Sequence, residues 1–271
     1  MRALRELLLL VGMFVIIGGG VYSAWRWWPG STTNKSLPSH VDTPLMVNAE
    51  GKLRDLIRRE VTLDAIKDPS VTEVVRRIYS RIQPGVGKTP YPIEIYVIDS
   101  PTINAMCLPG GLIIVYTGLL RRLEAPEELA AILAHESAHA VHRDSMHALE
   151  RELGIAAIFT LAGGRSDALL NRLVRRLIGS GFSRQQESSA DTEAERVLGA
   201  SDIDPGMLAE SLRHIRQSED SDPAVLQYLN THPDIESRIK TSEGLSAAWK
   251  GKARPIDVDW KEFRAQFKLL K

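Results

Sequence analysis

The sequence predicts an α+β fold that is predominantly helical, with a small three-stranded sheet, preceded by one N-terminal transmembrane helix. The strands are expected within residues 93–116, where residues 93–98 show the two-residue alternation typical of strands, and helical periodicity dominates the chain after them. A long uncharged apolar run lies near the start. At 271 residues the chain is long enough for one main domain with appendages.

The composition argues against several kinds of protein. The chain has 34 Lys and Arg against 34 Asp and Glu, so its net charge is zero and nothing indicates a nucleic-acid partner. Cys107 is the only cysteine, which excludes an intramolecular disulfide and a zinc site made of cysteines alone. We therefore expect packing to hold the domain together, with or without a metal ion.

Residues 1–28 are interpreted as a membrane anchor or a signal peptide. Residues 7–25 carry no charge, and a helix of that length rises about 28 Å, close to the roughly 30 Å of a bilayer's hydrocarbon core. Arginines precede the run, and three tryptophans stand at its end, where an interfacial belt would lie. Cleavage after Ala24 would place Tyr22 where a small residue is preferred, which favours an uncleaved anchor.

The rest of the chain divides into three parts. Residues 29–46 are rich in proline, glycine and serine, and we expect a flexible tether there. The folded domain is expected over residues 47–250. Residues 251–271 are expected to form a C-terminal tail that packs on the domain or binds a partner.

The first elements of the domain follow from its periodicity. Residues 53–82 predict one or two amphipathic helices, which stop before Pro84. Strands are predicted at residues 93–98, 102–108 and 112–116. Pro109-Gly110-Gly111 is expected to form the turn between the last two strands.

Helices are expected after the sheet. Pro126, followed by two glutamates, predicts a helix that runs to about Arg151. The apolar stretch 153–164 is too short to span a bilayer, and we interpret it as a buried helix or as part of a flap over residues 153–181. Ser183 and Gln186 form a capping box that opens a helix ending near Gly199. Further helices are expected at residues 169–178, after Asp204 and after Asp222.

A short pattern on the helix that begins at Pro126 indicates a metal site. His135 and His139 are four residues apart, which places both imidazoles on one face of a helix. Glu136 lies beside them, as expected of the general base in a zinc peptidase. The alternative is a surface helix with two unrelated histidines, but the apolar run 129–134 indicates that this helix packs into the core.

A catalytic zinc ion needs a third protein ligand and an open position. The metzincin pattern fails, because His142 and Ser145 stand where it requires glycine and histidine. Glu187 and Asp191 are again four residues apart, on a helix whose small residues would let it approach a partner closely. Glu187 can be the third ligand, with Asp191 accepting a hydrogen bond from a ligand imidazole. The alternative is a solvated acidic face.

These residues resemble the gluzincin metallopeptidases grouped with HtpX, BepA and the CAAX prenyl endopeptidases. The likeness extends from about Leu53 to Ile239, and it includes Asn104-Ala105 before Leu108-Pro109-Gly110-Gly111, Phe182-Ser183-Arg184, and Thr231-His232-Pro233 with Arg238-Ile239. It implies a gluzincin-like metallopeptidase domain that binds one Zn²⁺ through His135, His139 and Glu187 and uses Glu136 as its catalytic base.

The resemblance implies further roles. Asn104 and Ala105 would lie on an edge strand that binds an extended peptide through main-chain hydrogen bonds. His232 would lie near the zinc, either donating a hydrogen bond to the oxyanion of the reaction or occupying the open zinc position in a resting state. A histidine before a proline is otherwise typical of a helix N-cap or a surface site. We interpret Cys107 as a small buried residue rather than a thiolate ligand.

We therefore expect a membrane-anchored zinc endopeptidase that hydrolyses peptide bonds in unfolded or misassembled envelope proteins, as in protein quality control. Its partners would be protein or peptide substrates and the membrane, which it would cross once with the catalytic domain on the periplasmic side. Cleavage of the N-terminus would make it a secreted protein. One alternative is a zinc-stabilised binding or chaperone module with little turnover. Another is a mitochondrial setting, but the N-terminus lacks a presequence rich in arginine and serine.

Overall fold

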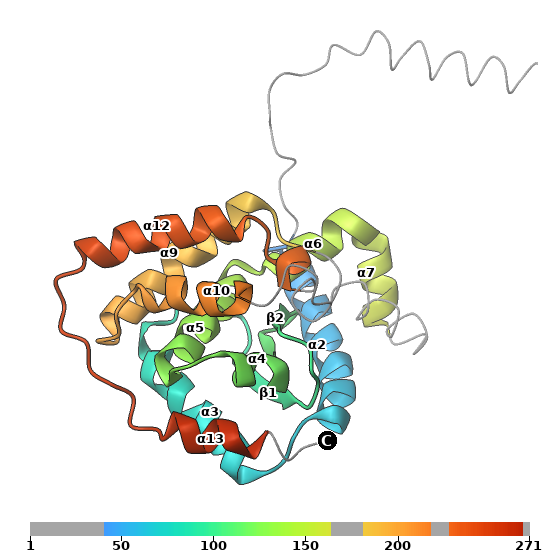
Figure 1. Cartoon of the computed structure of the whole chain (residues 1–271). Coiled ribbons are helices and arrows are strands. Elements are labelled where there is room, and N and C mark those ends of the chain that lie inside the picture. The colour runs from blue at the N-terminus through green and yellow to red at the C-terminus, as the bar shows by residue number, and fades with distance from the viewer. Residues whose placement is uncertain (1–40, 164–180, 218–227, 268–271) are drawn as a thin grey trace, which may run out of the picture. The chain divides into compact units, whose positions relative to one another are not determined.

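The chain divides into two units, Met1–Ser39 and His40–Lys271. The computed structural model describes residues 41–163, 181–217 and 228–267, all of which belong to the second unit (Figure 1). The apolar run 7–25, the helix expected at 169–178 and the helix expected after Asp222 lie outside the described residues. Within the described ranges, no helix is both long and apolar enough to cross a bilayer.

A three-stranded sheet lies at the centre of the described unit. It contains β1 (Glu94–Ile98), β2 (Ala105–Leu108) and β3 (Leu112–Tyr116), in the order β1-β3-β2. β1 runs parallel to β3, and β2 runs antiparallel to it. Gly110 and Gly111 have φ angles of 79° and 76°, which glycine adopts readily, so the predicted turn between β2 and β3 is confirmed. β2 is an edge strand, and it begins three residues later than predicted.

Two capped helices precede the sheet, as predicted for this region. α2 (Pro44–Asp64) has Thr43 as its N-cap, and α3 (Pro69–Ile82) has Asp68. Both helices begin with proline, whose fixed φ suits the first helical position. α2 therefore begins inside the segment 29–46 that we expected to be a tether. A short 3₁₀ turn, η1 (Gln83–Gly85), follows α3.

The helix after the sheet is shorter than predicted. Following α4 (Thr117–Arg122), α5 (Pro126–His142) ends at Arg143, so the prediction that it runs to about Arg151 is wrong. Arg143 has a left-handed φ of 54°, and α6 (Asp144–Leu153) starts directly after it. Its buried guanidinium donates a hydrogen bond of 2.9 Å from Nε to Glu50 and another to the Val41 carbonyl. These bonds offset a backbone strain of about 1–3 kcal/mol.

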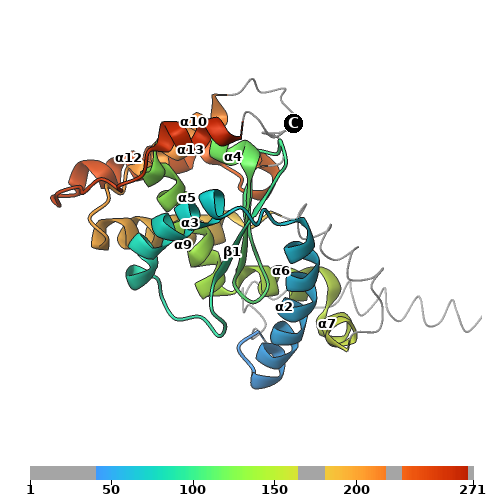
Figure 2. The ribbon, with the colours of Figure 1, turned by 90° about the horizontal axis from the view of Figure 1, so that it is seen from below.

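Five further helices complete the described part of the chain. They are α7 (Ile155–Ala162), α9 (Arg184–Ala200), α10 (Met207–Arg216), α12 (Ile235–Ala248) and α13 (Trp260–Gln266). α7 forms within the predicted apolar stretch and packs on α2 (Figure 2). α9 opens with the predicted capping box and packs on α5 (Figure 1), and its Ala190 and Ala194 are fully buried. Ser188 and Ser189 are instead exposed.

Apolar side chains cover both faces of the sheet. One buried cluster joins Ile113 and Val115 of β3 to α3, α5, α9 and α10. A second joins Leu112 and Ile114 to α2, α6 and α7. Every residue of β3 is buried, as expected of a central strand covered on both sides. The α+β class with a small three-stranded sheet is therefore confirmed.

The C-terminal segment packs on the same unit. Trp260, Phe263 and Phe267 are at most 5 % exposed, and α13 lies against α3 (Figure 2). The Trp260 indole N–H donates a 2.9 Å hydrogen bond to the Leu123 carbonyl, just before α5. This segment therefore contributes to the core that supports the metal-binding pattern.

Candidate metal centre

α5 directs two imidazoles toward one point. The Nε2 atoms of His135 and His139 are 3.1 Å apart, and both side chains are fully buried. The other ring nitrogens face carboxylates: His135 Nδ1 is 2.9 Å from Asp191 Oδ1, and His139 Nδ1 is 2.7 Å from Asp144 Oδ2. Hydrogen bonds from Nδ1–H to these carboxylates leave the Nε2 lone pairs free to bind a cation.

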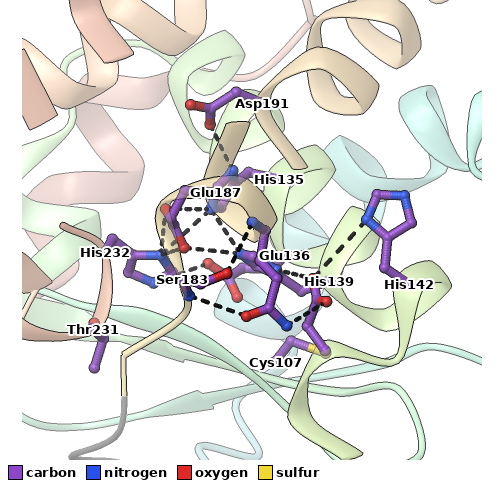
Figure 3. A network of polar contacts seen from close by, with 12 residues as sticks. Cys107, His135, Glu136, His139, His142, Ser183, Glu187, Asp191, Thr231 and His232 are labelled. Carbon is purple, nitrogen blue, oxygen red and sulfur yellow. Dashed lines mark hydrogen bonds and ion pairs between the residues drawn. The ribbon is translucent and has the colours of Figure 1, made fainter. Parts of the chain in front are cut away.

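Two further side chains complete the cluster, as Figure 3 shows. Glu187, from α9, has carboxylate oxygens 3.3 Å from His139 Nε2 and 3.6 Å from His135 Nε2. His232 Nδ1 lies 3.2 Å from Glu187 Oε1 and 3.4 Å from His135 Nε2. One ligand atom from each of the four residues lies within 4.8 Å of the others. Tetrahedral zinc with bonds of about 2.0–2.1 Å separates its ligands by roughly 3.3–3.4 Å, so the donor set fits this ion.

Glu136 has the surroundings of a reactive group. Its side chain is fully buried, and neither carboxylate oxygen has a hydrogen-bond partner among the described residues. His232 Nε2 lies 3.5 Å from Glu136 Oε1. A buried carboxylate without hydrogen bonds is costly, so its presence beside the cluster indicates that a ligand or substrate completes the site.

A sequence model of peptidase family M48 matches residues 65–246, about two thirds of the chain. The chain belongs to peptidase family M48. The predicted resemblance to the family of HtpX and BepA is therefore confirmed.

Several curated proteins are similar to this M48 chain. The mitochondrial metalloendopeptidase OMA1 of Schizosaccharomyces pombe is 32 % identical over 64 % of this chain and 52 % of its own length. The beta-barrel assembly-enhancing protease of Escherichia coli is 25 % identical over 72 % of this chain and 43 % of its own length. A protease HtpX homolog of Thermodesulfovibrio yellowstonii is 27 % identical over 66 % of this chain and 76 % of its own length. The matched region thus spans about half of the first two relatives.

Arg238 of α12 links the carboxylates of this M48 site. Its guanidinium donates two hydrogen bonds of 2.7 Å to Asp191 and lies 2.6 Å from Glu187 Oε2. Burial opposes ionisation of Asp191, but Arg238 and His135 outweigh it and lower the pKa of Asp191 to about 2. Burial likewise opposes ionisation of Glu187, but His232 and His139 hold its pKa far below the usual range. Both carboxylates are therefore ionised near neutral pH.

The two helical histidines differ in their electrostatic surroundings. Burial, together with the nearby Arg238, lowers the pKa of His135. Burial also opposes protonation of His139, but its contacts with Asp144 and Glu187 raise its pKa to about 9. The acidic surroundings therefore favour positive charge at this point, whether that charge is a proton or a metal ion.

The predicted substrate strand lies beside the cluster. Asn104 is fully buried, and its side-chain nitrogen is 3.5 Å from Thr231 Oγ1. Tyr116 N–H donates to the Asn104 carbonyl, so the alternating ladder turns the main-chain groups of Ala105 and Cys107 away from β3. Ser145 Oγ already donates a 2.5 Å hydrogen bond to the Cys107 carbonyl.

The cleft beside β2 is narrow. Its lining includes Met106, Cys107 and Leu108 of β2, together with Phe182 and His232. The Phe182 ring stacks on His139 with ring centres 3.9 Å apart. Because the four cluster residues and Glu136 are at most 1 % exposed, the described arrangement leaves no path for a peptide to reach them.

Burial raises the pKa of the Cys107 thiol well above its usual value, which disfavours the thiolate that a zinc ligand would require.

Sequence reasoning missed two residues that support the cluster, Asp144 and Arg238. Arg238 was noticed only as part of a motif, and its buried pairing was not predictable because α12 is far from α9 in the sequence. Asp144 was missed because an unbroken helix would turn it away from His139.

Proposed function

We propose that this M48 protein is a zinc-dependent endopeptidase in which His135, His139 and Glu187 hold the ion and Glu136 is the catalytic base. The observation that carries the proposal is the convergence of two Nε2 atoms and a carboxylate beside a buried carboxylate that has no hydrogen-bond partner of its own among the described residues. The printed names of the relatives, which describe metalloendopeptidases and proteases, support the same class.

The proposed reaction divides the work among the residues. Zinc bound in the cluster would polarise the scissile carbonyl and make a water molecule acidic enough to attack it. Glu136 accepts a proton from the attacking water and later delivers it to the leaving amine. Arg238 keeps Asp191 and Glu187 ionised in a buried setting, and Asp191 holds the Nδ1–H form of His135.

His232 has two positions in this proposal. In the closed arrangement its Nδ1 takes the fourth corner of the cluster, 3.2 Å from Glu187 Oε1. When a substrate displaces it, the imidazole remains close enough to donate a hydrogen bond to the developing oxyanion. The same opening has to free the cleft between β2 and Phe182 before a peptide can enter.

We propose that substrates bind as extended segments along the outer edge of β2. Main-chain groups of Ala105 and Cys107 face that side, and the buried Asn104 anchors the start of the strand to Thr231. Recognition through the main chain accepts many sequences but requires a locally unfolded chain. Unfolded or misassembled envelope proteins, a quality-control role, fit this requirement.

We further propose that residues 1–28 anchor the protein in a membrane, with residues 29–40 leading to the domain on the extracytoplasmic side. The uncharged run 7–25 supports the anchor. The test is extraction of the full chain and of a chain lacking residues 1–28 with alkaline carbonate. Release of the full chain into the soluble fraction would contradict the anchor.

The catalytic proposal is tested with Glu136→Gln. We expect the full chain to bind one zinc ion and to cleave denatured casein, and the variant to retain the zinc and lose the cleavage. Glu60→Gln, on the exposed side of α2, is the matched control and should cleave like the wild type. Cleavage by the Glu136→Gln variant at the wild-type rate would refute the mechanism.

The closed cleft favours one second candidate, a zinc-stabilised binding or chaperone module with little turnover. Full burial of the five central residues is what such a module would show. Zinc binding at one ion per chain, with suppression of casein aggregation and no cleavage, would favour this candidate. Glu136, whose carboxylate has no hydrogen-bond partner among the described residues, argues against it, because a structural zinc site needs no base.

A further inference from the structure

A chain of hydrogen bonds connects the two helices that carry the metal-binding cluster. Ser183 N–H, at the start of α9, donates to Gln186 Oε1 at 3.0 Å. Gln186 Nε2 donates to Asp144 Oδ1 at 2.7 Å. Asp144 Oδ2 is 2.7 Å from His139 Nδ1, on α5. These hydrogen bonds therefore connect the helix of Glu187 to the imidazole of His139 through Asp144, the first residue of α6.

The direction of every donor in this chain is determined by chemistry. A main-chain N–H can only donate, so the Gln186 side chain must present its oxygen to Ser183 and its NH₂ group to Asp144. The Asp144 carboxylate can then only accept, from Gln186 on one oxygen and from His139 Nδ1–H on the other. The remaining lone pair of His139, on Nε2, must therefore face the cluster.

The geometry of the α5–α6 junction makes this contact possible. In an unbroken helix, Asp144 would lie five residues beyond His139, about 140° around the axis and on another face. The left-handed Arg143 ends α5 at this point and returns Asp144 to the imidazole. The Asp144 side chain is 5 % exposed, so water does not substitute for its partners.

We infer that Asp144 and Gln186 are positioning residues that hold His139 in its metal-binding form and align it with Glu187. The inference rests on the proposed zinc function and adds to it. The capping box alone would account for Gln186 Oε1, but it leaves the bond from Nε2 to Asp144 without a purpose. Glutamate would close the same capping box and would place a carboxylate against Asp144.

The variants Asp144→Asn and Gln186→Glu each break this series of hydrogen bonds at one contact. An asparagine that accepts from His139 turns its NH₂ group toward the NH₂ group of Gln186. If its amide is reversed, it donates to Nδ1 and moves the imidazole proton to Nε2, where it blocks the metal. In Gln186→Glu, two carboxylates face each other. We expect each single variant to bind zinc about 10–100-fold more weakly than the wild type.

The double variant Asp144→Asn/Gln186→Glu restores every donor and acceptor. The introduced glutamate would accept from Ser183 N–H and from the asparagine NH₂ group, and the asparagine oxygen would accept from His139 Nδ1–H. We therefore expect the double variant to bind zinc more tightly than either single variant. If the two residues had merely structural roles, the losses of zinc affinity in the two single variants would add in the double variant.

The measurement is zinc affinity of the full chain by competition with a chromophoric chelator, for the wild type, both single variants and the double variant. The melting temperature of the same four proteins in excess EDTA provides a readout without metal. We expect each single variant to melt about 2–4 °C lower and the double variant to recover. Asp55→Asn, a surface change on α2, is the matched control and should leave both readouts unchanged.

Two results would overturn the inference while leaving the proposed function intact. One is single variants that bind zinc as tightly as the wild type. The other is a double variant whose loss equals the sum of the single losses. A wild-type chain that binds no zinc would instead overturn the proposed function, and the positioning role with it.

Discussion

Glu195 provides a test of the electrostatics of α9 at a distance from the metal-binding cluster. It lies one turn beyond Asp191, is 6 % exposed, and has one carboxylate oxygen without a hydrogen-bond partner among the described residues. Burial, with a smaller contribution from the charge of Asp191, raises the pKa of Glu195 from 4.5 to about 7. We expect Glu195→Gln to stabilise the protein at pH 8, because it removes a buried charge and keeps the shape.

The pKa shift determines both the size and the pH range of the effect. A carboxyl group whose pKa is raised in the folded state stabilises the fold when protonated, and this stability is lost as the pH rises from the unfolded pKa of about 4.5 to the folded pKa of about 7. A shift of about 2.5 pH units corresponds to roughly 3 kcal/mol. Glu195→Gln should recover about 2–3 kcal/mol at pH 8 and almost none at pH 4.5.

The assay is urea unfolding of the wild type and Glu195→Gln at pH 4.5 and pH 8, with EDTA present so that zinc binding does not contribute. Glu193→Gln is the matched control, because Glu193 is two residues away and pairs with Arg196 at the surface. This control should be neutral or slightly destabilising at pH 8. Equal stabilities of the wild type and Glu195→Gln at pH 8, or a gain of the same size at both pH values, would refute the reasoning.

Three other predictions concern the metal, the C-terminal segment and the β2–β3 turn. His232→Ala should weaken zinc binding in the competition assay because it empties the fourth corner of the cluster; unchanged affinity with a lower kcat on casein would instead assign His232 to the substrate alone. Trp260→Ala should cost about 3–5 kcal/mol of unfolding free energy in urea, because it leaves a cavity beside α3; a loss below about 1 kcal/mol would show that α13 does not stabilise the domain. Gly110→Ala should lower the melting temperature, because its φ is 79° and a Cβ would lie 2.5 Å from the Arg54 Cβ; an unchanged melting temperature would contradict this packing.

Local patterns predicted much of the fold. Three strands were predicted within residues 93–116, where residues 93–98 alternate, and Pro109-Gly110-Gly111 identified the turn between the last two, because strand period and glycine turns depend on neighbouring residues. The capping box at Ser183 identified the start of α9 for the same reason. Spacing of four residues also placed His135 beside His139 and Glu187 near Asp191.

Errors occurred where distant residues decide local structure. The end of α5 at His142 depends on Arg143, whose left-handed conformation is held by Glu50 and Val41, about 90–100 residues earlier in the chain. Without knowledge of this break between α5 and α6, the contact of Asp144 with His139 could not be predicted. For the expected tail 251–271, the sequence left open whether it packs on the domain or binds a partner.

The sequence by itself predicted the chemistry that we propose for this protein. The types and spacing of His135, Glu136, His139 and Glu187 predict the metal and the base, because helix geometry converts a spacing of four residues into a shared face. Only the tertiary structure decided how those groups are oriented and reached. Asp144, Asp191 and Arg238 come to the cluster from separate helices, and His232 and Phe182 close it. Such contacts depend on how the helices pack together, which no local pattern specifies.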